Sequence, residues 1–144
     1  ANRAGGYELR DDKTFKGTIA PKDISLIAGE ANNAPHCIFE GFMDFLSLLT
    51  MKGKEIAPCL VLNSVSNLSR AIAYLHEKGI DSVQAFFDND QAGRQALHSL
   101  QSAGINVEDM SRHYSRYKDL NEYHVAQRTG QKQVIPPRKR GLRR

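Results

Sequence analysis

Short apolar runs alternate with apolar residues at helical spacing through the middle of the chain. The runs predict buried strands at 35–39, 57–62, 82–87 and 105–110. The first three runs are each followed by a helical repeat, which predicts helices that end at Gly53, Gly79 and Gly104. Ser66 is the predicted N-cap of the second helix. A last helix is predicted over 119–128, with Gly130 as its end.

Three strand-helix units in succession predict an α/β fold, with a parallel sheet of about four strands and helices on both faces. An antiparallel sheet would need hairpin turns between these elements, and the sequence has none there. Residues 5–27 differ, because short strand-like segments alternate with polar turns and predict a small N-terminal antiparallel extension. We therefore expect an extension (1–34), a core (35–128) and a basic C-terminal tail (129–144).

The composition indicates a globular domain, since 40% of the 144 residues are hydrophobic and 25% are charged. The apolar runs are too short to span a bilayer and the N-terminus lacks a signal-peptide pattern, so we expect a cytoplasmic protein with no membrane partner. Cys37 and Cys59 lie in strand-like runs and are expected to be buried free thiols. The chain begins with Ala1 rather than Met, as a fragment of a longer protein would.

The net charge of +4 arises in the tail. Five cationic residues lie within 138–144, so the rest of the chain is close to neutral. Such a tail can bind nucleic acid through phosphate charges, or it can be a solvated terminus. Its composition leaves both interpretations open.

Acidic residues follow two of the predicted strands, where each strand turns into a helix. Glu40 and Asp44 follow the first strand, and Asp88 and Asp90 follow the third. The carboxyl ends of parallel strands share one edge of the sheet, where ligands bind, so these carboxylates are expected to meet. Converging carboxylates repel one another unless a cation joins them, and hard oxygen ligands suit Mg²⁺ or Mn²⁺. The pattern therefore predicts a metal site.

The same residues also have purely structural interpretations. Glu40 and Asp44 would then be polar groups near a helix N-terminus, and Asp88 and Asp90 would be helix caps. The segment 118–122 resembles a capping box, in which Asp119 would only cap the last helix.

Other polar residues fall near the same predicted edge and are candidate phosphate or nucleic-acid contacts. Their alternative roles are turn stabilisation or an exposed helix charge. The candidates are Asn63, Ser64, Arg94 and Lys118.

Together these motifs resemble the Toprim domain, which bacterial-type primases, topoisomerases and some nucleases share. The family pattern has a Glu followed by Gly after the first strand, as at 40–41, and an Asp-x-Asp after the third. The sequence Asp-Asn-Asp-Gln-Ala-Gly at 88–93 resembles the form found in primase-type members, and 118–122 resembles the Lys-Asp segment that follows. Residues 5–10 resemble the stretch before the core in primase-like proteins of bacterial mobile elements.

The resemblance implies a primase-like nucleotidyltransferase core that makes RNA primers during replication. Its partners would be a DNA template and nucleoside triphosphates, with a replicative helicase as a further candidate. Glu40, Asp88 and Asp90 would be catalytic, and the same three residues with Asp119 would bind Mg²⁺ or Mn²⁺.

Two rival functions remain open. A Toprim metal-dependent nuclease would use the same carboxylates with water as the nucleophile, and a non-catalytic DNA-binding or recruitment module would keep the fold with a vestigial site. A bacterial replicative primase also has a zinc module and a basic subdomain that holds the template. Neither is recognisable in this sequence, so unaided primer synthesis is expected only if they belong to a longer natural chain.

Overall fold

The computed structural model of the chain describes residues 1–10, 16–19, 22–29, 35–53 and 56–134. Its strands are β1 (Tyr7–Arg10), β2 (Lys16–Ile19), β3 (Ser25–Ile27), β4 (His36–Phe39), β5 (Cys59–Val61), β6 (Ser82–Phe86) and β7 (Asn106–Asp109). Its helices are α1 (Phe42–Lys52), α2 (Leu68–Glu77), α3 (Gln91–Ser102) and α4 (Leu120–Val134), with short 3₁₀ helices η1 (Val65–Asn67) and η2 (Met110–Tyr114).

In the part of the chain that the structure describes, five strands form the main sheet, in the order β3-β5-β4-β6-β7. β4, β5, β6 and β7 are parallel, as predicted, whereas β3 runs antiparallel to β5. The last residue of β4, Phe39, pairs with Val61 of β5 and with Phe86 of β6. The carboxyl ends of these three strands therefore lie together at one edge of the sheet.

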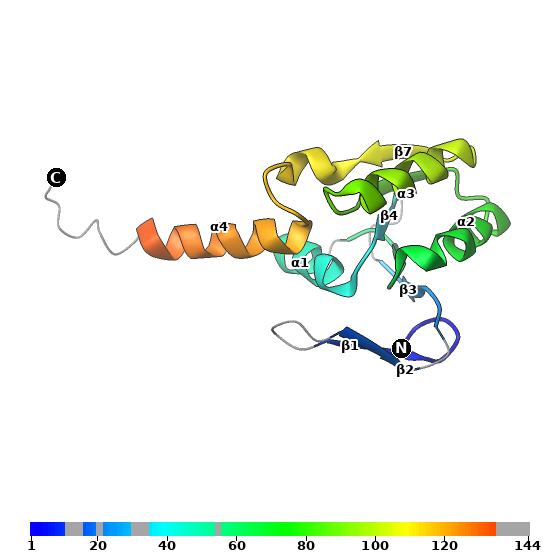
Figure 1. Cartoon of the computed structure of the whole chain (residues 1–144), viewed down its shortest axis with the longest axis horizontal. Helices are drawn as coiled ribbons and strands as arrows, with labels where there is room; N and C mark the ends of the chain where they lie inside the picture. Colours follow the sequence, from blue (N-terminus) through cyan, green and yellow to red (C-terminus); the bar gives the residue numbers. More distant parts are fainter. Residues whose placement is uncertain (11–15, 20–21, 30–34, 54–55, 135–144) are drawn as a thin grey trace, which may run out of the picture.

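The two faces of the sheet are covered by different helices (Figure 1). On one face, Leu75 of α2 and Leu100 of α3 belong to the same buried cluster as Ile38. On the other face, Phe45 of α1 and Leu120 of α4 cluster with Phe39. Ile38 and Phe39 are both fully buried, although they point to opposite faces. This explains why residues 37–39 of β4 are apolar without alternation.

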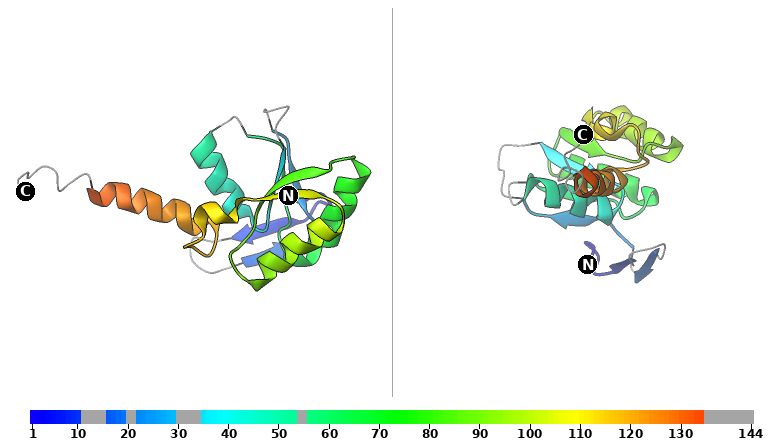
Figure 2. Two further views of the ribbon diagram at one scale, coloured as in Figure 1. Left: turned by 90° about the horizontal axis from the view of Figure 1, so that it is seen from above. Right: turned by 90° about the vertical axis from the view of Figure 1, so that its left-hand side faces the viewer.

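The N-terminal extension is confirmed in part. β1 and β2 form an antiparallel hairpin that lies apart from the main sheet (Figures 1 and 2). The segment 23–27, expected in the extension, instead contributes β3 to the main sheet, which has five strands rather than four. Its placement has a physical cause, because the fully buried Ile24 packs in the core with Leu60 and Leu62. Residues 11–15, within the segment expected to form these short strands, lie outside the described residues.

Two predicted helix boundaries are wrong. α4 continues through Gly130 to Val134, because one glycine inside a helix costs only about 1 kcal/mol relative to alanine. Ser66 does not cap α2, since the turn of η1 intervenes and α2 follows Asn67 without a side-chain cap hydrogen bond. Ser64 instead accepts a hydrogen bond from the backbone N–H of Ser66 and caps η1.

Cys37 and Cys59 are buried and free, as expected from the sequence. Among the described residues, no helix combines the length and the apolar character that crossing a membrane requires.

Candidate functional site

The ends of β4 and β6 are joined by an acidic side chain. Glu40 follows β4, and its Oε1 atom accepts a hydrogen bond from the backbone N–H of Asp88, with an N···O distance of 2.8 Å. Gly93 of α3 lies against the same contact. A Cβ at Gly93 would lie 2.1 Å from the backbone oxygen of Asp88 and 2.9 Å from Oε1 of Glu40, so this close packing requires glycine.

Asp44 lies in the first turn of α1 and is only 5% exposed. Its Oδ1 atom accepts a hydrogen bond from the backbone N–H of Asn121, at 3.0 Å. Ser47, one turn further along α1, donates from its hydroxyl to Oδ1 of Asn121, at 2.9 Å. These two bonds fix the start of α4 against α1 and hold Asp44 in place.

Asp119 precedes α4 and has the capping geometry that the sequence indicated. Its Oδ1 atom accepts from the backbone N–H of Glu122 at 2.8 Å, while Oε1 of Glu122 accepts from the N–H of Lys118 at 2.9 Å. The cap does not exclude a second role, because the same carboxylate faces Asp44 and Asp88.

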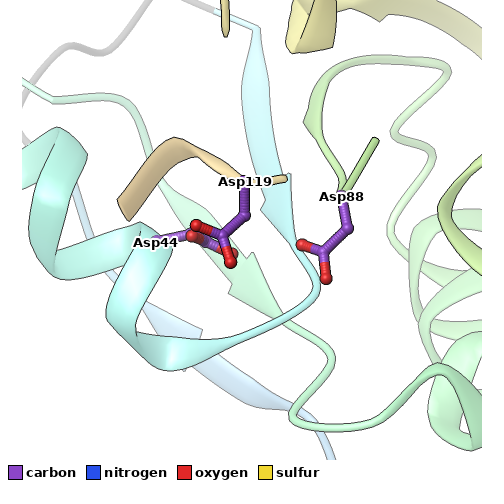
Figure 3. Close-up of side chains that lie close together, drawn as sticks. All are labelled: Asp44, Asp88 and Asp119. Carbon is purple, nitrogen blue, oxygen red and sulfur yellow. The ribbon is translucent and has the colours of Figure 1, made fainter. Parts of the chain in front are cut away.

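The carboxylates of Asp44, Asp88 and Asp119 converge (Figure 3). One oxygen of each lies within 4.8 Å of the others, close to the span of about 4.2 Å between opposite oxygens of an octahedral Mg²⁺. Burial and the nearby acids raise the pKa of Asp44 to about 8 and that of Asp88 to about 7. Burial also raises the pKa of Glu40, although its hydrogen bond from Asp88 opposes this shift. Three carboxylate oxygens in this arrangement are hard donors that fit a divalent cation.

Asp90 is the N-cap of α3 in the structure. Its Oδ1 atom accepts from the backbone N–H of Gly93 at 2.8 Å and caps α3, which matches the structural interpretation. Among the described residues, the group close enough to share an ion consists of Asp44, Asp88 and Asp119, without Asp90 or Glu40. Asp90 and Glu40 therefore surround this group rather than belong to it.

The predicted phosphate contacts are dispersed. The positive charge of Lys118 favours ionisation of both Glu40 and Asp88, which places Lys118 near the acids. Arg94 is an exposed residue one turn into α3, and Ser64 caps η1. Asn63 has a left-handed backbone with φ of 68°, and its Nδ2 atom donates to Asp23 and Ser25 at the edge of the sheet. The Oδ1 atom of Asn63 is buried without a hydrogen-bond partner.

The four metal ligands expected from the sequence did not include Asp44, and Asn89 was given no role. Asp44 lies, like Glu40, just after a predicted strand, so its position in the sequence could have indicated that its carboxylate lies near the others. For Asn89, the only signal was its place between two acids.

Comparisons with known proteins agree with this geometry. The family model described as Toprim-like matches residues 37–124. The primase fragment of the bacteriophage T7 primase-helicase protein is similar in structure, with a TM-score of 0.62 and 21% identity, over 90% of this chain and 56% of that one. A chain from a T7 lagging-strand DNA polymerase complex with primase domains, an RNA/DNA hybrid and dTTP gives a TM-score of 0.58 and 17% identity, over 84% and 64%. No curated protein matches the sequence.

The chain thus spans less than two thirds of either solved chain. Within this length the family match covers every residue of the convergent acidic group, from Asp44 to Asp119. The match also covers more than half of the sequence, and the chain therefore belongs to the Toprim-like family.

Proposed function

We propose that the chain is the core of a primase-like nucleotidyltransferase, which makes RNA primers on a DNA template with Mg²⁺ or Mn²⁺. The observation that carries this proposal is the convergence of Asp44, Asp88 and Asp119 at the carboxyl edge of a sheet with a phage-primase fold. Residues 35–128 would form the catalytic core, flanked by the extension at 1–34 and the basic tail at 129–144.

In primer extension, a 3′-hydroxyl oxygen attacks the α-phosphorus of a nucleoside triphosphate and pyrophosphate leaves. A divalent cation, when bound, supplies positive charge where the phosphate oxygens become more negative. Asp44, Asp88 and Asp119 would hold the cation. Lys118, near the same acids, would contact the phosphates as a fixed positive charge, and Arg94 would do so from α3.

Glu40 has a different role in this scheme. Its carboxylate holds the backbone of Asp88, and its raised pKa brings it closer to the range in which a carboxylate can accept and return a proton. We therefore assign Glu40 to proton transfer and to the positioning of Asp88. Asp90 would act through the N-terminus of α3, which it caps.

Template-dependent incorporation of labelled ribonucleotides tests the function directly. The assay should use the longest natural form of the protein, with Asp88→Asn as the inactive control. Incorporation that requires template, Mg²⁺ and Asp88 would support the proposal. Cleavage of single-stranded DNA without incorporation would identify a nuclease, and nucleic-acid binding with neither reaction would identify a recruitment module.

A further inference from the structure

Asn89, the residue between the two acids of the Asp-Asn-Asp motif, is hydrogen-bonded to the segment that leads to Asp119. Its side-chain Nδ2 atom donates to the backbone oxygens of Tyr114 and Tyr117, both at 2.9 Å. Its backbone N–H donates to the oxygen of Lys118 at 2.6 Å. A single residue therefore binds this segment at three points.

The segment needs such support, because residues 115–119 belong to no helix or strand. Tyr114 adds a bond in the opposite direction, since its buried hydroxyl donates to the backbone oxygen of Phe87 at 2.9 Å. Phe87 and Asn89, the residues directly before and after Asp88, thus both bind the segment. This arrangement sets the distance between Asp88 and Asp119.

The chemistry of the contact selects an amide. Two carbonyl oxygens lie 2.9 Å from one side-chain atom, and a third, that of Ser111, lies farther away at 3.5 Å. This atom must therefore carry two hydrogens that point in different directions. The –NH₂ group of asparagine can donate one hydrogen to each carbonyl oxygen at 2.9 Å. A carboxylate at this position would instead place its lone pairs against those of the carbonyl oxygens. Loss of the amide would remove the side-chain donor from the backbone oxygen of Tyr117, whereas that of Tyr114 would keep its bond from the N–H of Tyr117. A backbone oxygen left without its donor in a protein interior costs about 1–3 kcal/mol.

We propose that Asn89 is a positioning residue of the metal site, which acts by presenting the Asp119 carboxylate to Asp44 and Asp88. This inference rests on the proposed metal-binding function. Asn89 does not touch the ion in this scheme. Its effect on the ion passes through the segment 114–118, in the way that residues behind metal ligands orient them.

A merely structural role for Asn89 would lower the stability of the fold and leave metal affinity unchanged. Asn67 offers a matched control, because it is buried and its Nδ2 atom donates to a backbone oxygen, that of Leu62, at 2.9 Å. Asn67→Ala therefore removes the same kind of hydrogen bond from a place that does not bind the segment before Asp119.

Manganese titration, read from the electron paramagnetic resonance signal of free Mn²⁺, measures the effect without an activity assay. The variants are Asn89→Ala, Asn67→Ala, Asp119→Asn and the double variant of Asn89 and Asp119. We expect Asn89→Ala to weaken Mn²⁺ binding by about tenfold or more, the range found for residues that orient ligands. Asn67→Ala should bind Mn²⁺ like the parent. In the Asp119→Asn background, Asn89→Ala should add less than about a twofold loss, because both changes act through one carboxylate.

Parental Mn²⁺ affinity in Asn89→Ala, together with weaker binding in Asp119→Asn, would overturn the inference and leave the metal site standing. Fully additive losses would overturn it as well, since Asn89 would then act by another route. Unchanged affinity in Asp119→Asn would overturn both the inference and the assignment of Asp119 as a ligand.

If Asn89→Ala does not fold, Tyr114→Phe removes only the hydroxyl bond to Phe87. It should weaken Mn²⁺ binding in the same direction by a smaller factor, and parental affinity there would contradict the inference.

Discussion

The carboxylate of Glu40 and the backbone N–H of Asp88 form a hydrogen bond of 2.8 Å between residues that follow two adjacent parallel strands. The bond places a half-buried acidic group beside the convergent acids. It also couples the two motifs that the sequence analysis identified separately. The same contact therefore serves the geometry of the site and adds to its negative charge.

Changing Glu40 to Gln should separate these two effects. The amide oxygen of glutamine can accept the same hydrogen bond, while the negative charge disappears. We expect the metal-free protein to be as stable as the parent or more stable by up to about 1 kcal/mol, a stability–function trade-off. Nucleotidyl transfer should fall by about a hundredfold or more, the loss typical of a group that transfers a proton.

Urea unfolding without divalent ions and primer extension measure the two quantities. Glu77→Gln, an exposed residue at the end of α2, is the control that should change neither. Transfer at nearly the parental rate by Glu40→Gln in the longest natural form would rule out the proposed role of Glu40.

Gly93→Ala should strongly destabilise the protein. The added carbon would meet the backbone oxygen of Asp88 at 2.1 Å, so either α3 or the Asp-Asn-Asp turn must move, at a cost of about 1–3 kcal/mol or more. Gly130→Ala is a sharp contrast, because Gly130 lies in α4 with nothing within 4 Å of an added Cβ. That substitution should stabilise the helix by about 0.5–1 kcal/mol. Thermal unfolding of both variants tests the pair, and equal effects would contradict the packing described at Gly93.

The stability of the metal-free protein should fall as the pH rises from about 4 to about 8. Unfolded aspartates titrate near pH 3.9, whereas the pKa of Asp88 is raised to about 7 and that of Asp44 to about 8 in the folded protein. Between these limits the native state holds more protons than the unfolded chain, so each increase in pH favours unfolding. Urea midpoints across this range, measured with a chelator, give the slope.

Asp44→Asn should flatten that slope, because it removes the group with the higher pKa. Millimolar Mg²⁺ should also flatten it in the parent, since a ligand that binds only the native state stabilises that state. Metal-free stability that rises steadily from pH 4 to pH 8 would contradict the electrostatic description of the site.

The sequence predicted the main architecture because its signals are local. The strand runs and the glycines at Gly53, Gly79 and Gly104 each act over a few residues. All three glycines have a positive φ, which side chains disfavour and which commonly ends a helix. The parallel order then followed from the repetition of strand and helix, and it placed Glu40 and Asp88 at one edge. β3 was assigned to the wrong sheet, because Ile24 and its strand are stabilised by core contacts with residues distant in sequence.

The composition of the acidic group was predicted less well for the same reason. Asp44 is buried because α4 packs on α1 through Ser47 and Asn121, and that contact leaves no periodic signal in the sequence. The caps formed by Asp90 and Asp119 were recognised from local spacing. Asp119 faces the other carboxylates because of the path that residues 110–119 take, and local spacing in the sequence does not determine that path.

Removal of residues 138–144 should weaken nucleic-acid binding without changing the rate of the chemical step. The truncation deletes five positive charges and none of the acidic residues. If these residues contact phosphates, the slope of log affinity against log salt should become less steep by up to about 0.7 to 0.9 per lost contact. Fluorescence anisotropy with labelled single-stranded DNA at several salt concentrations measures this slope, and an identical slope in both forms would show that the tail does not take part.

The repulsion among Asp44, Asp88 and Asp119 exists only when β4, β6 and the start of α4 have come together. In the unfolded chain the three carboxylates lie far apart in sequence and hardly interact. The rest of the fold therefore holds the three carboxylates together against their electrostatic repulsion. Local opening at the ends of these elements relieves that repulsion. A bound cation cancels this repulsion in the folded state, where the three carboxylates are close together. It should therefore slow unfolding more than it accelerates folding.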